Sequence, residues 1–151
     1  ETCSAILYNH ESPRRSANFV TMKIARAVAA IKKGRQSELV LGALTGMRDW
    51  GWAPDYARGL WKILQSNPVD DYILATGKLH SVQNLVEKAF ESVGLNWKDH
   101  VKFSSDLVTT VEPLAPCGNP GKIKRVLGWE NTVPFEEMIA RMVQSELAKL
   151  S

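Results

Sequence analysis

The sequence of 151 residues has only two cysteines, Cys3 and Cys117, and neither belongs to a CxxC pair or to a cluster with histidine. Two cysteines far apart in the chain are typical of reduced thiols in a cytoplasmic protein, and they argue against a disulfide scaffold or a zinc site. Long apolar runs are also missing, since no stretch approaches the ~18 apolar residues that a membrane helix needs. The first residues lack the charged segment and cleavage site of a signal peptide. We therefore expect a cytoplasmic protein with no bound metal and no membrane partner.

An excess of charge of one sign is missing as well. The 19 Lys and Arg residues against 16 Asp and Glu residues give a formal net charge of +3. This excess is too small and too dispersed to predict a nucleic-acid partner, although it leaves room for a local anion site. With 44% hydrophobic and 23% charged residues, the composition is that of an ordinary folded domain, and we expect one unit over residues 1–151.

The usual nucleotide-binding and catalytic motifs of nucleotide enzymes are also absent from these residues. There is no GxGxxG or GxxGxxG turn for a dinucleotide pyrophosphate and no GxxxxGK[ST] loop. The residues four positions after the three tyrosines are Ser12, Leu60 and Thr76, so no tyrosine has a lysine one helical turn away. The chain therefore cannot supply a tyrosine base activated by such a lysine, and we expect no catalytic residue within it.

Hydrophobic periodicity predicts strands that alternate with helices. The expected strands cover residues 3–8, 38–42, 72–76 and 101–103, and the expected helices cover 17–33, 54–66, 82–93, 120–127 and 134–147. The first strand reads as buried, and polar or glycine-rich loops are expected at 9–16 and 42–54. The alternation predicts an α/β fold with a partial Rossmann-like parallel sheet and helices. So few strands leave an exposed sheet edge, which predicts self-association or pairing with another segment.

The densest polar segment runs from Asn9 to Arg15, between the first predicted strand and helix. This is where open α/β sheets present ligand-binding residues. Arg14 and Arg15 could bind a phosphate in a forked geometry, with help from the following helix N-terminus. A solvated loop in which Ser12 or Asn9 satisfies turn donors explains the same residues equally well.

A second candidate is the glycine-containing stretch from Leu41 to Gly51. Its glycines permit close backbone approach, and Arg48 could meet a phosphate, but Asp49 could instead neutralise Arg48 in a structural pair. The tryptophans at positions 50 and 52 could stack on a base or simply pack. Single residues such as Lys23 and Glu112 stay ambiguous by chemistry alone.

Several motifs together resemble the GDP-mannose 4,6-dehydratase family. The segments that carry the resemblance are NHESPRR at 9–15, RDWG at 48–51, DYILATG at 71–77, GNP at 118–120 and LGW at 127–129. The last of these is shared more widely by nucleotide-sugar epimerases and dehydratases. The resemblance extends over nearly the whole chain.

The resemblance implies the C-terminal, substrate-binding part of an extended short-chain dehydrogenase, with the NADP-binding Rossmann part absent from residues 1–151. The complete enzyme would use NADP to convert GDP-mannose to GDP-4-keto-6-deoxymannose, and this chain alone would be inactive. NADP is not expected to bind it tightly. By position in the family motifs, the cofactor-binding residues are His10 and Arg15, and the substrate-binding residues are Asn9, Lys23, Gly42, Arg48 and Glu112.

Three positions depart from the family pattern. Thr109 stands where an arginine is usual three residues before Glu112, which would remove a phosphate partner, and Ser16 and Ala43 replace a usual glycine and a frequent asparagine. Two alternatives stay open. The chain could come from a GDP-4-keto-6-deoxymannose reductase, which shares the fold and the nucleotide, although the NHESPRR segment argues against it. It could also be a non-catalytic nucleotide-sugar-binding or interaction module, as Thr109 suggests. We expect the chain either to form a homo-oligomer or to pair with the missing N-terminal half.

Overall fold

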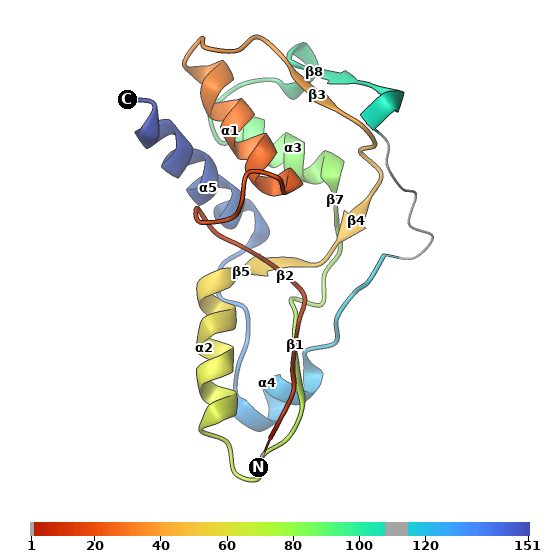
Figure 1. Ribbon diagram of the computed structural model, residues 1–151, viewed down its shortest axis with the longest axis vertical. Coiled ribbons are helices and arrows are strands. Elements are labelled where there is room, and N and C mark those ends of the chain that lie inside the picture. The colour runs from red at the N-terminus through yellow and green to blue at the C-terminus, as the bar shows by residue number, and fades with distance from the viewer. Residues whose placement is uncertain (1, 108–114) are drawn as a thin grey trace.

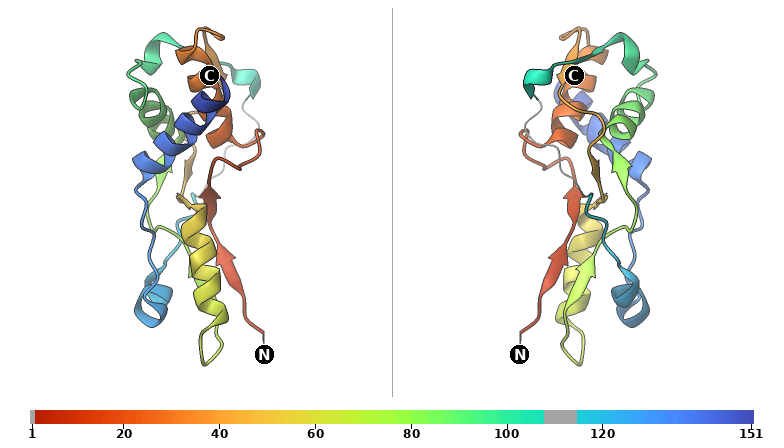
Figure 2. Two further views of the ribbon diagram at one scale, coloured as in Figure 1. Left: turned by 90° about the vertical axis from the view of Figure 1, so that its left-hand side faces the viewer. Right: turned by 90° about the vertical axis from the view of Figure 1, so that its right-hand side faces the viewer.

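The computed structural model describes residues 2–107 and 115–151. Thr109 and Glu112, both singled out from the sequence, therefore lie outside the described residues. Figure 1 shows an elongated molecule with two lobes and a narrow waist, and Figure 2 shows the same two lobes from both sides. The chain's first described residues lie at the far end of one lobe, and its C-terminus lies in the other.

The larger lobe, called here the helical lobe, is built from three helices and one parallel strand pair. These elements are α1 (Val20–Lys32), α3 (Val82–Glu91), α5 (Phe135–Lys149), β3 (Leu39–Leu41) and β8 (Val101–Phe103). Two short 3-10 turns, Trp97–Asp99 and Ser105–Leu107, flank β8. Local signals explain the start of α3, because Ser81 accepts a hydrogen bond from the backbone N–H of Asn84 and completes a capping box.

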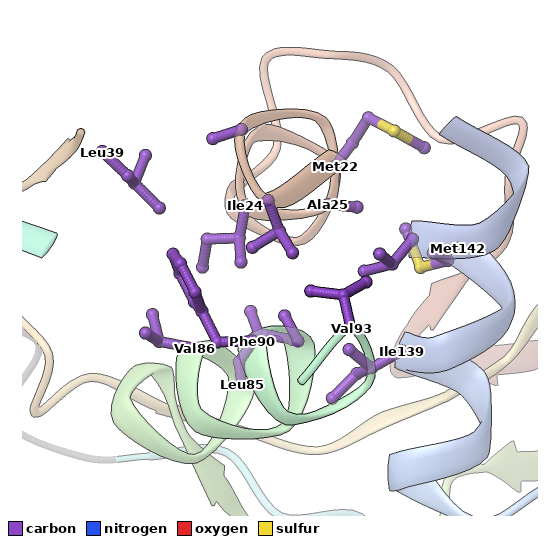
Figure 3. Close-up of a cluster of buried hydrophobic side chains, with 14 of the residues drawn as sticks. Met22, Ile24, Ala25, Leu39, Leu85, Val86, Phe90, Val93, Ile139 and Met142 are labelled. Carbon is purple, nitrogen blue, oxygen red and sulfur yellow. The ribbon is translucent and has the colours of Figure 1, made fainter. Parts of the chain in front are cut away.

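The core of the helical lobe lies where its three helices meet (Figure 3). Apolar residues of α1 recur at helical spacing, and Ile24 and Val28 are fully buried against α3 and α5. Phe90 from α3 and Val143 from α5 are also fully buried. Each such side chain stabilises the fold by roughly 1.5–3 kcal/mol relative to an exposed position, so this cluster holds the lobe together.

The smaller lobe, called here the strand lobe, has a separate core. It consists of α2 (Ala53–Leu64), α4 (Gly121–Leu127) and the parallel pair of β1 (Ala5–Leu7) with β6 (Tyr72–Leu74). Its buried cluster contains Tyr56, Ile63, Tyr72, Leu74, Ile123 and Trp129. The molecule is therefore stabilised by two apolar cores.

Two further strand pairs cross the waist. β2 (Asn9–Glu11) pairs in parallel with β5 (Trp50–Trp52), and β4 (Met47–Arg48) pairs antiparallel with β7 (His80–Ser81). The parallel α/β fold predicted from the sequence is confirmed, but among the described residues the strands form four separate pairs, one of them antiparallel.

Two buried aspartates at the waist accept hydrogen bonds from the loops that connect the lobes. Asp49 accepts hydrogen bonds from Gly77 N at 2.9 Å, from Gly118 N at 3.2 Å, and from both the backbone N and the hydroxyl of Thr76. Asp55 accepts hydrogen bonds from the backbone N and the hydroxyl of Thr132 and from the backbone N of Val133, all in the segment that leads into α5. Both carboxylates are 1% exposed. They fix the loops that connect the lobes, because buried backbone N–H groups must find acceptors.

Two expectations about strands were wrong. The predicted buried strand over 3–8 is a three-residue strand in which Ile6 is 52% and Leu7 is 37% exposed, since β1 pairs with β6 on only one edge within the described residues. The predicted loops at 9–16 and 42–54 contain β2, β4 and β5. Their partners lie far away in the sequence, so local pattern gave no sign of them.

No helix among the described residues is long and apolar enough to cross a membrane.

Candidate functional site

The parallel pairing of β2 with β5 assembles the candidate site at the waist. Its register sets Asn9 opposite Trp50 and His10 opposite Gly51. Arg48 lies two residues before Trp50, so the two polar segments identified in the sequence come together here. A cavity of about 280 Å³ opens between them, lined by Asn9, Glu11, Phe19, Val20, Thr21, Gly46, Arg48, Trp50 and Val82.

Glu11 is the buried acid of this cavity. It is 1% exposed, and its Oε2 accepts a hydrogen bond of 2.6 Å from the hydroxyl of Thr21 in the first turn of α1. Burial raises the pKa of the Glu11 carboxyl, and the Thr21 hydrogen bond together with nearby Arg15 and His10 opposes that rise. The carboxylate therefore links strand β2 to helix α1.

Arg15 lies against the same carboxylate. Its Nε is 3.3 Å from Glu11 Oε2, and its guanidinium carbon lies 3.4 Å from the ring centroid of Phe19. The buried Nε–H makes no well-aligned hydrogen bond, so the contact is an ion pair reinforced by stacking on the aromatic ring. Glu11 thus offsets the charge of Arg15 and Phe19 sets its orientation.

His10 belongs to a column of aromatic rings. Its Nδ1 lies 2.8 Å from the carbonyl oxygen of Tyr8, and its ring stacks on Tyr56 with centroids 5.2 Å apart. Tyr56 in turn meets Trp129 edge to face at 5.7 Å, and Trp129 Nε1 donates to the carbonyl of Asp55. Tyr56 from α2 and Trp129, which follows α4, thus determine where His10 lies.

Tyr56 has one unusual atom. Its hydroxyl is buried and has no hydrogen-bond partner among the described residues. Burial and the neighbouring carboxylates of Asp49 and Asp55 raise its pKa well above the ordinary value of a tyrosine. The ring fits only because residue 51 is a glycine, since a Cβ there would lie 2.7 Å from the hydroxyl oxygen.

The remaining predicted residues are placed as follows. Arg48 is half-buried, and its Nη1 donates to the carbonyl of Met47 at 2.7 Å. Lys23 is exposed on α1, and Gly42 directly follows β3. Neither lines the cavity. The ligand assignments of these two residues, of Glu112 and of the other predicted site residues all stay predictions. His10 and Arg15 flank Glu11 in the same motif but also lie outside the cavity lining.

A larger cavity of about 430 Å³ lies at the waist between the lobes, and Trp50 lines both cavities. Its walls include Thr76, Trp129 and Phe135, and the imidazole of His80 stacks on Phe135 with centroids 3.7 Å apart. Burial lowers the pKa of His80. No cluster of three or more metal-binding side chains occurs within residues 2–107 and 115–151.

Sequence reasoning missed Glu11, Thr21 and Tyr56 as members of the site. Glu11 lies inside the NHESPRR segment, but Arg14 and Arg15 were the residues predicted to bind a ligand there. Thr21 was indistinguishable from other polar residues of an amphipathic helix. Tyr56 lies within the helix predicted at 54–66, and nothing in the periodicity signals that its ring reaches His10.

The sequence model of one family, described as GDP-mannose 4,6 dehydratase, matches residues 1–142. Curated relatives agree with this match. The chain is 45% identical over 145 residues to GDP-mannose 4,6 dehydratase 1 of Arabidopsis thaliana, covering 96% of this chain and 40% of that protein. It is 38% identical over 161 residues to the Homo sapiens GDP-mannose 4,6 dehydratase, covering 95% of this chain and 43% of that one. The chain thus spans about two fifths of the length of these relatives.

Solved structures share the fold at lower identity. RMD from Pseudomonas aeruginosa, solved as an NADPH complex, superposes with a TM-score of 0.88 at 17% identity over 97% of this chain and 48% of that chain. The dTDP-glucose 4,6-dehydratase from Bacillus anthracis, solved with NAD, gives 0.77 at 19% identity over 95% and 43%.

The fold is therefore that of the Rossmann-type dehydratases and epimerases of the extended short-chain dehydrogenase class. Within that class, the chain belongs to the GDP-mannose 4,6-dehydratase family.

Proposed function

We propose that this chain is the nucleotide-sugar-binding part of a GDP-mannose 4,6-dehydratase and binds GDP-mannose at the waist. The observation that carries the proposal is that Asn9 and Arg48, from two separate sequence motifs, line one cavity. At about 280 Å³ the cavity is slightly below the ~300–1,000 Å³ of typical small-molecule sites. We therefore infer that it holds one end of the nucleotide sugar while the rest extends along the surface.

The chemistry of the cavity suits an anionic ligand with an apolar portion. The guanidinium of Arg48 can hold a diphosphate oxygen pair through two parallel hydrogen bonds. The amide of Asn9 offers both donors and an acceptor to hydroxyl groups. Trp50 and Val82 supply an apolar wall.

NADP belongs to the proposed reaction of the complete enzyme, in which it would take up a hydride and return it. In this chain His10 and Arg15 would meet the cofactor, since both lie beside the cavity and flank Glu11. The 151 residues contain no glycine-rich pyrophosphate turn and no Tyr-x-x-x-Lys pair. We infer that these residues alone bind the substrate without turning it over.

The proposed partner is the cofactor-binding half that the complete enzyme requires, or a second copy of the chain. The exposed edge of the β1 and β6 pair and the exposed apolar residues Ile6, Leu60, Trp61 and Leu64 support this part of the proposal. A cytoplasmic setting is also proposed, since Cys3 and Cys117 are free thiols.

Calorimetry can test the binding proposal directly. GDP-mannose and GDP should both bind the chain, and Arg48→Ala should weaken binding of both by roughly tenfold or more, because it removes a charge-assisted hydrogen bond. Arg125→Ala, at an exposed position on α4, is the matched control and should bind as the unaltered chain does. Absence of binding to either nucleotide would overturn the proposal and favour an interaction module.

A chimera can test the proposed activity. The part of the Arabidopsis thaliana relative that precedes the matched region would be fused in front of this chain, and formation of the 4-keto sugar from GDP-mannose and NADP would be measured. The chimera should be active, its Arg48→Ala variant should be slower at low GDP-mannose concentration by roughly the tenfold loss of binding, and the chain alone should show no turnover. Turnover by the chain alone would contradict the inference that it is inactive.

A further inference from the structure

The aromatic column of Trp129, Tyr56 and His10 runs from the strand-lobe core to the candidate site. Trp129 is 1% exposed and held by its hydrogen bond to Asp55, so the inner end of the column is fixed. Tyr56 is also 1% exposed and stacks on His10 with an angle of 26° between the rings. Such a pair of rings restricts rotation of the imidazole about its side-chain bonds.

The second restraint on His10 decides which ring nitrogen carries the proton. Nδ1 faces the carbonyl oxygen of Tyr8 at 2.8 Å, and a carbonyl oxygen can only accept, so Nδ1 must be the protonated nitrogen. In the neutral imidazole Nε2 is then an acceptor. No hydrogen-bond partner for Nε2 occurs among the described residues.

We propose that Tyr56 is a positioning residue that holds His10 as a hydrogen-bond acceptor, and that the ligand group at Nε2 is a neutral donor, a hydroxyl or a carboxamide N–H of the cofactor. The inference rests on the proposed contact between His10 and NADP. A phosphate oxygen at Nε2 would bring two acceptors together.

The ring of Tyr56, and not its hydroxyl, carries this role. The hydroxyl has no partner among the described residues, whereas the ring touches His10 on one side and Trp129 on the other. Gly51, the strand partner of His10, leaves the space in which the ring lies. A phenylalanine can therefore replace Tyr56 in this role, and an aliphatic residue cannot.

The test compares three variants by nuclear magnetic resonance of the imidazole nitrogens in the chain and by titration with NADP of the chimera described above, because the chain alone is not expected to bind NADP tightly. In the unaltered chain, Nδ1 of His10 should be protonated, and the ring current of Tyr56 should shift the His10 carbon-bound protons upfield. Tyr56→Leu should abolish the ring-current shift, mix the tautomers and weaken NADP binding by about tenfold. Tyr56→Phe should retain the ring-current shift, the single tautomer and the NADP binding of the unaltered protein.

Ile63→Ala separates positioning from loss of packing. Ile63 is buried in the same core as Tyr56, but His10 stacks on Tyr56 and not on Ile63. This variant should be less stable while its His10 spectrum and NADP response match the unaltered chain. If Ile63→Ala alters His10 as strongly as Tyr56→Leu does, or if Tyr56→Leu leaves His10 unchanged, the positioning role is overturned.

The same titration distinguishes the failure of this inference from the failure of the proposed cofactor contact. On adding NADP, the Nε2 signal should move upfield as it accepts a hydrogen bond while the nitrogen stays unprotonated. Protonation of Nε2 on binding would overturn the donor assignment. If NADP binds the chimera but moves no His10 signal, the proposed contact and the donor assignment both fail. The His10 spectra of the ligand-free variants still decide the role of Tyr56 in that case.

Discussion

At the scale of single residues, the buried Glu11 connects the site to the fold. Its carboxylate accepts from Thr21 and lies beside Arg15, so one side chain orders both the strand and the helix that border the cavity. The sequence predicted a ligand-binding role for the NHESPRR segment, but it assigned that role to the two arginines and not to Glu11. Which residue of that segment becomes buried depends on the pairing of β2 with β5, and that pairing cannot be read from the segment itself.

Glu11→Gln should change how stability depends on pH. Burial raises the pKa of Glu11 above its ordinary value of 4.5, so its contribution to stability is full at low pH and declines as the pH rises through the raised value. The glutamine variant lacks this decline, and its unfolding free energy relative to the unaltered chain should increase from about pH 4 toward pH 8. Urea unfolding at several pH values measures the difference. Thr21→Val, which removes the opposing hydrogen bond, should make the decline steeper, and a difference that does not vary with pH would contradict the prediction.

Asp49→Ala should strongly destabilise the fold. The sequence left open whether Asp49 is a partner of Arg48, and the structure shows its oxygens accepting from Thr76, Gly77 and Gly118. Hydrogen bonds to a charged group contribute about 1.5–3 kcal/mol each, and the loops can recover part of the loss through water, so we expect a cost of about 3 kcal/mol. Asp49→Asn, which retains one acceptor oxygen, should cost less. Denaturant unfolding of both variants gives the comparison, and equal costs would argue against the hydrogen-bond explanation.

At the scale of elements, helices were predicted well because their signals are local. The helix predicted at 17–33 is α1 (Val20–Lys32), and Gly34 follows it with a φ of +67°, as expected of a residue that ends a helix. The helix predicted at 82–93 is α3 (Val82–Glu91). The strands β4 and β5 were missed inside a glycine-rich segment, because each depends on a partner that is distant in the sequence.

Ser81→Ala should weaken α3 by about 1 kcal/mol, within the usual range of 0.5–2 kcal/mol for loss of an N-cap. The change removes the oxygen that accepts from Asn84 N at 3.0 Å and breaks the capping box. Thermal or urea unfolding measures the loss. Ser92→Ala is the control near the other end of the helix, where the hydroxyl only donates to the Ala89 carbonyl, and it should cost less.

At the scale of the whole molecule, α2 carries two apolar faces. One face packs into the strand lobe through Tyr56 and Ile63, and the other exposes Ala57, Leu60, Trp61 and Leu64 at helical spacing. Trp61 is 62% and Leu64 is 75% exposed. The sequence predicted an exposed sheet edge that favours association, but it did not predict this stripe, since the same periodicity fits a helix with a single buried face.

The stripe should make the isolated chain associate at high concentration. Burying large apolar side chains contributes roughly 25 cal/mol per Å², and these residues are solvent-exposed in the single chain. Light scattering over a concentration series should show growth in mass, and the double variant Trp61→Glu with Leu64→Lys should reduce it. Lys98→Glu, at an exposed site in the helical lobe, should leave it unchanged. A strictly monomeric chain at every concentration would contradict this prediction.

The two lobes are also interlaced along the chain. β1 belongs to the strand lobe, α1 and β3 to the helical lobe, α2 and β6 to the strand lobe, α3 and β8 to the helical lobe, α4 to the strand lobe and α5 to the helical lobe (Figure 1). Neither lobe therefore corresponds to a continuous stretch of sequence. A single cut at any point divides at least one lobe between two fragments, so the lobes cannot be obtained as independent pieces by truncation.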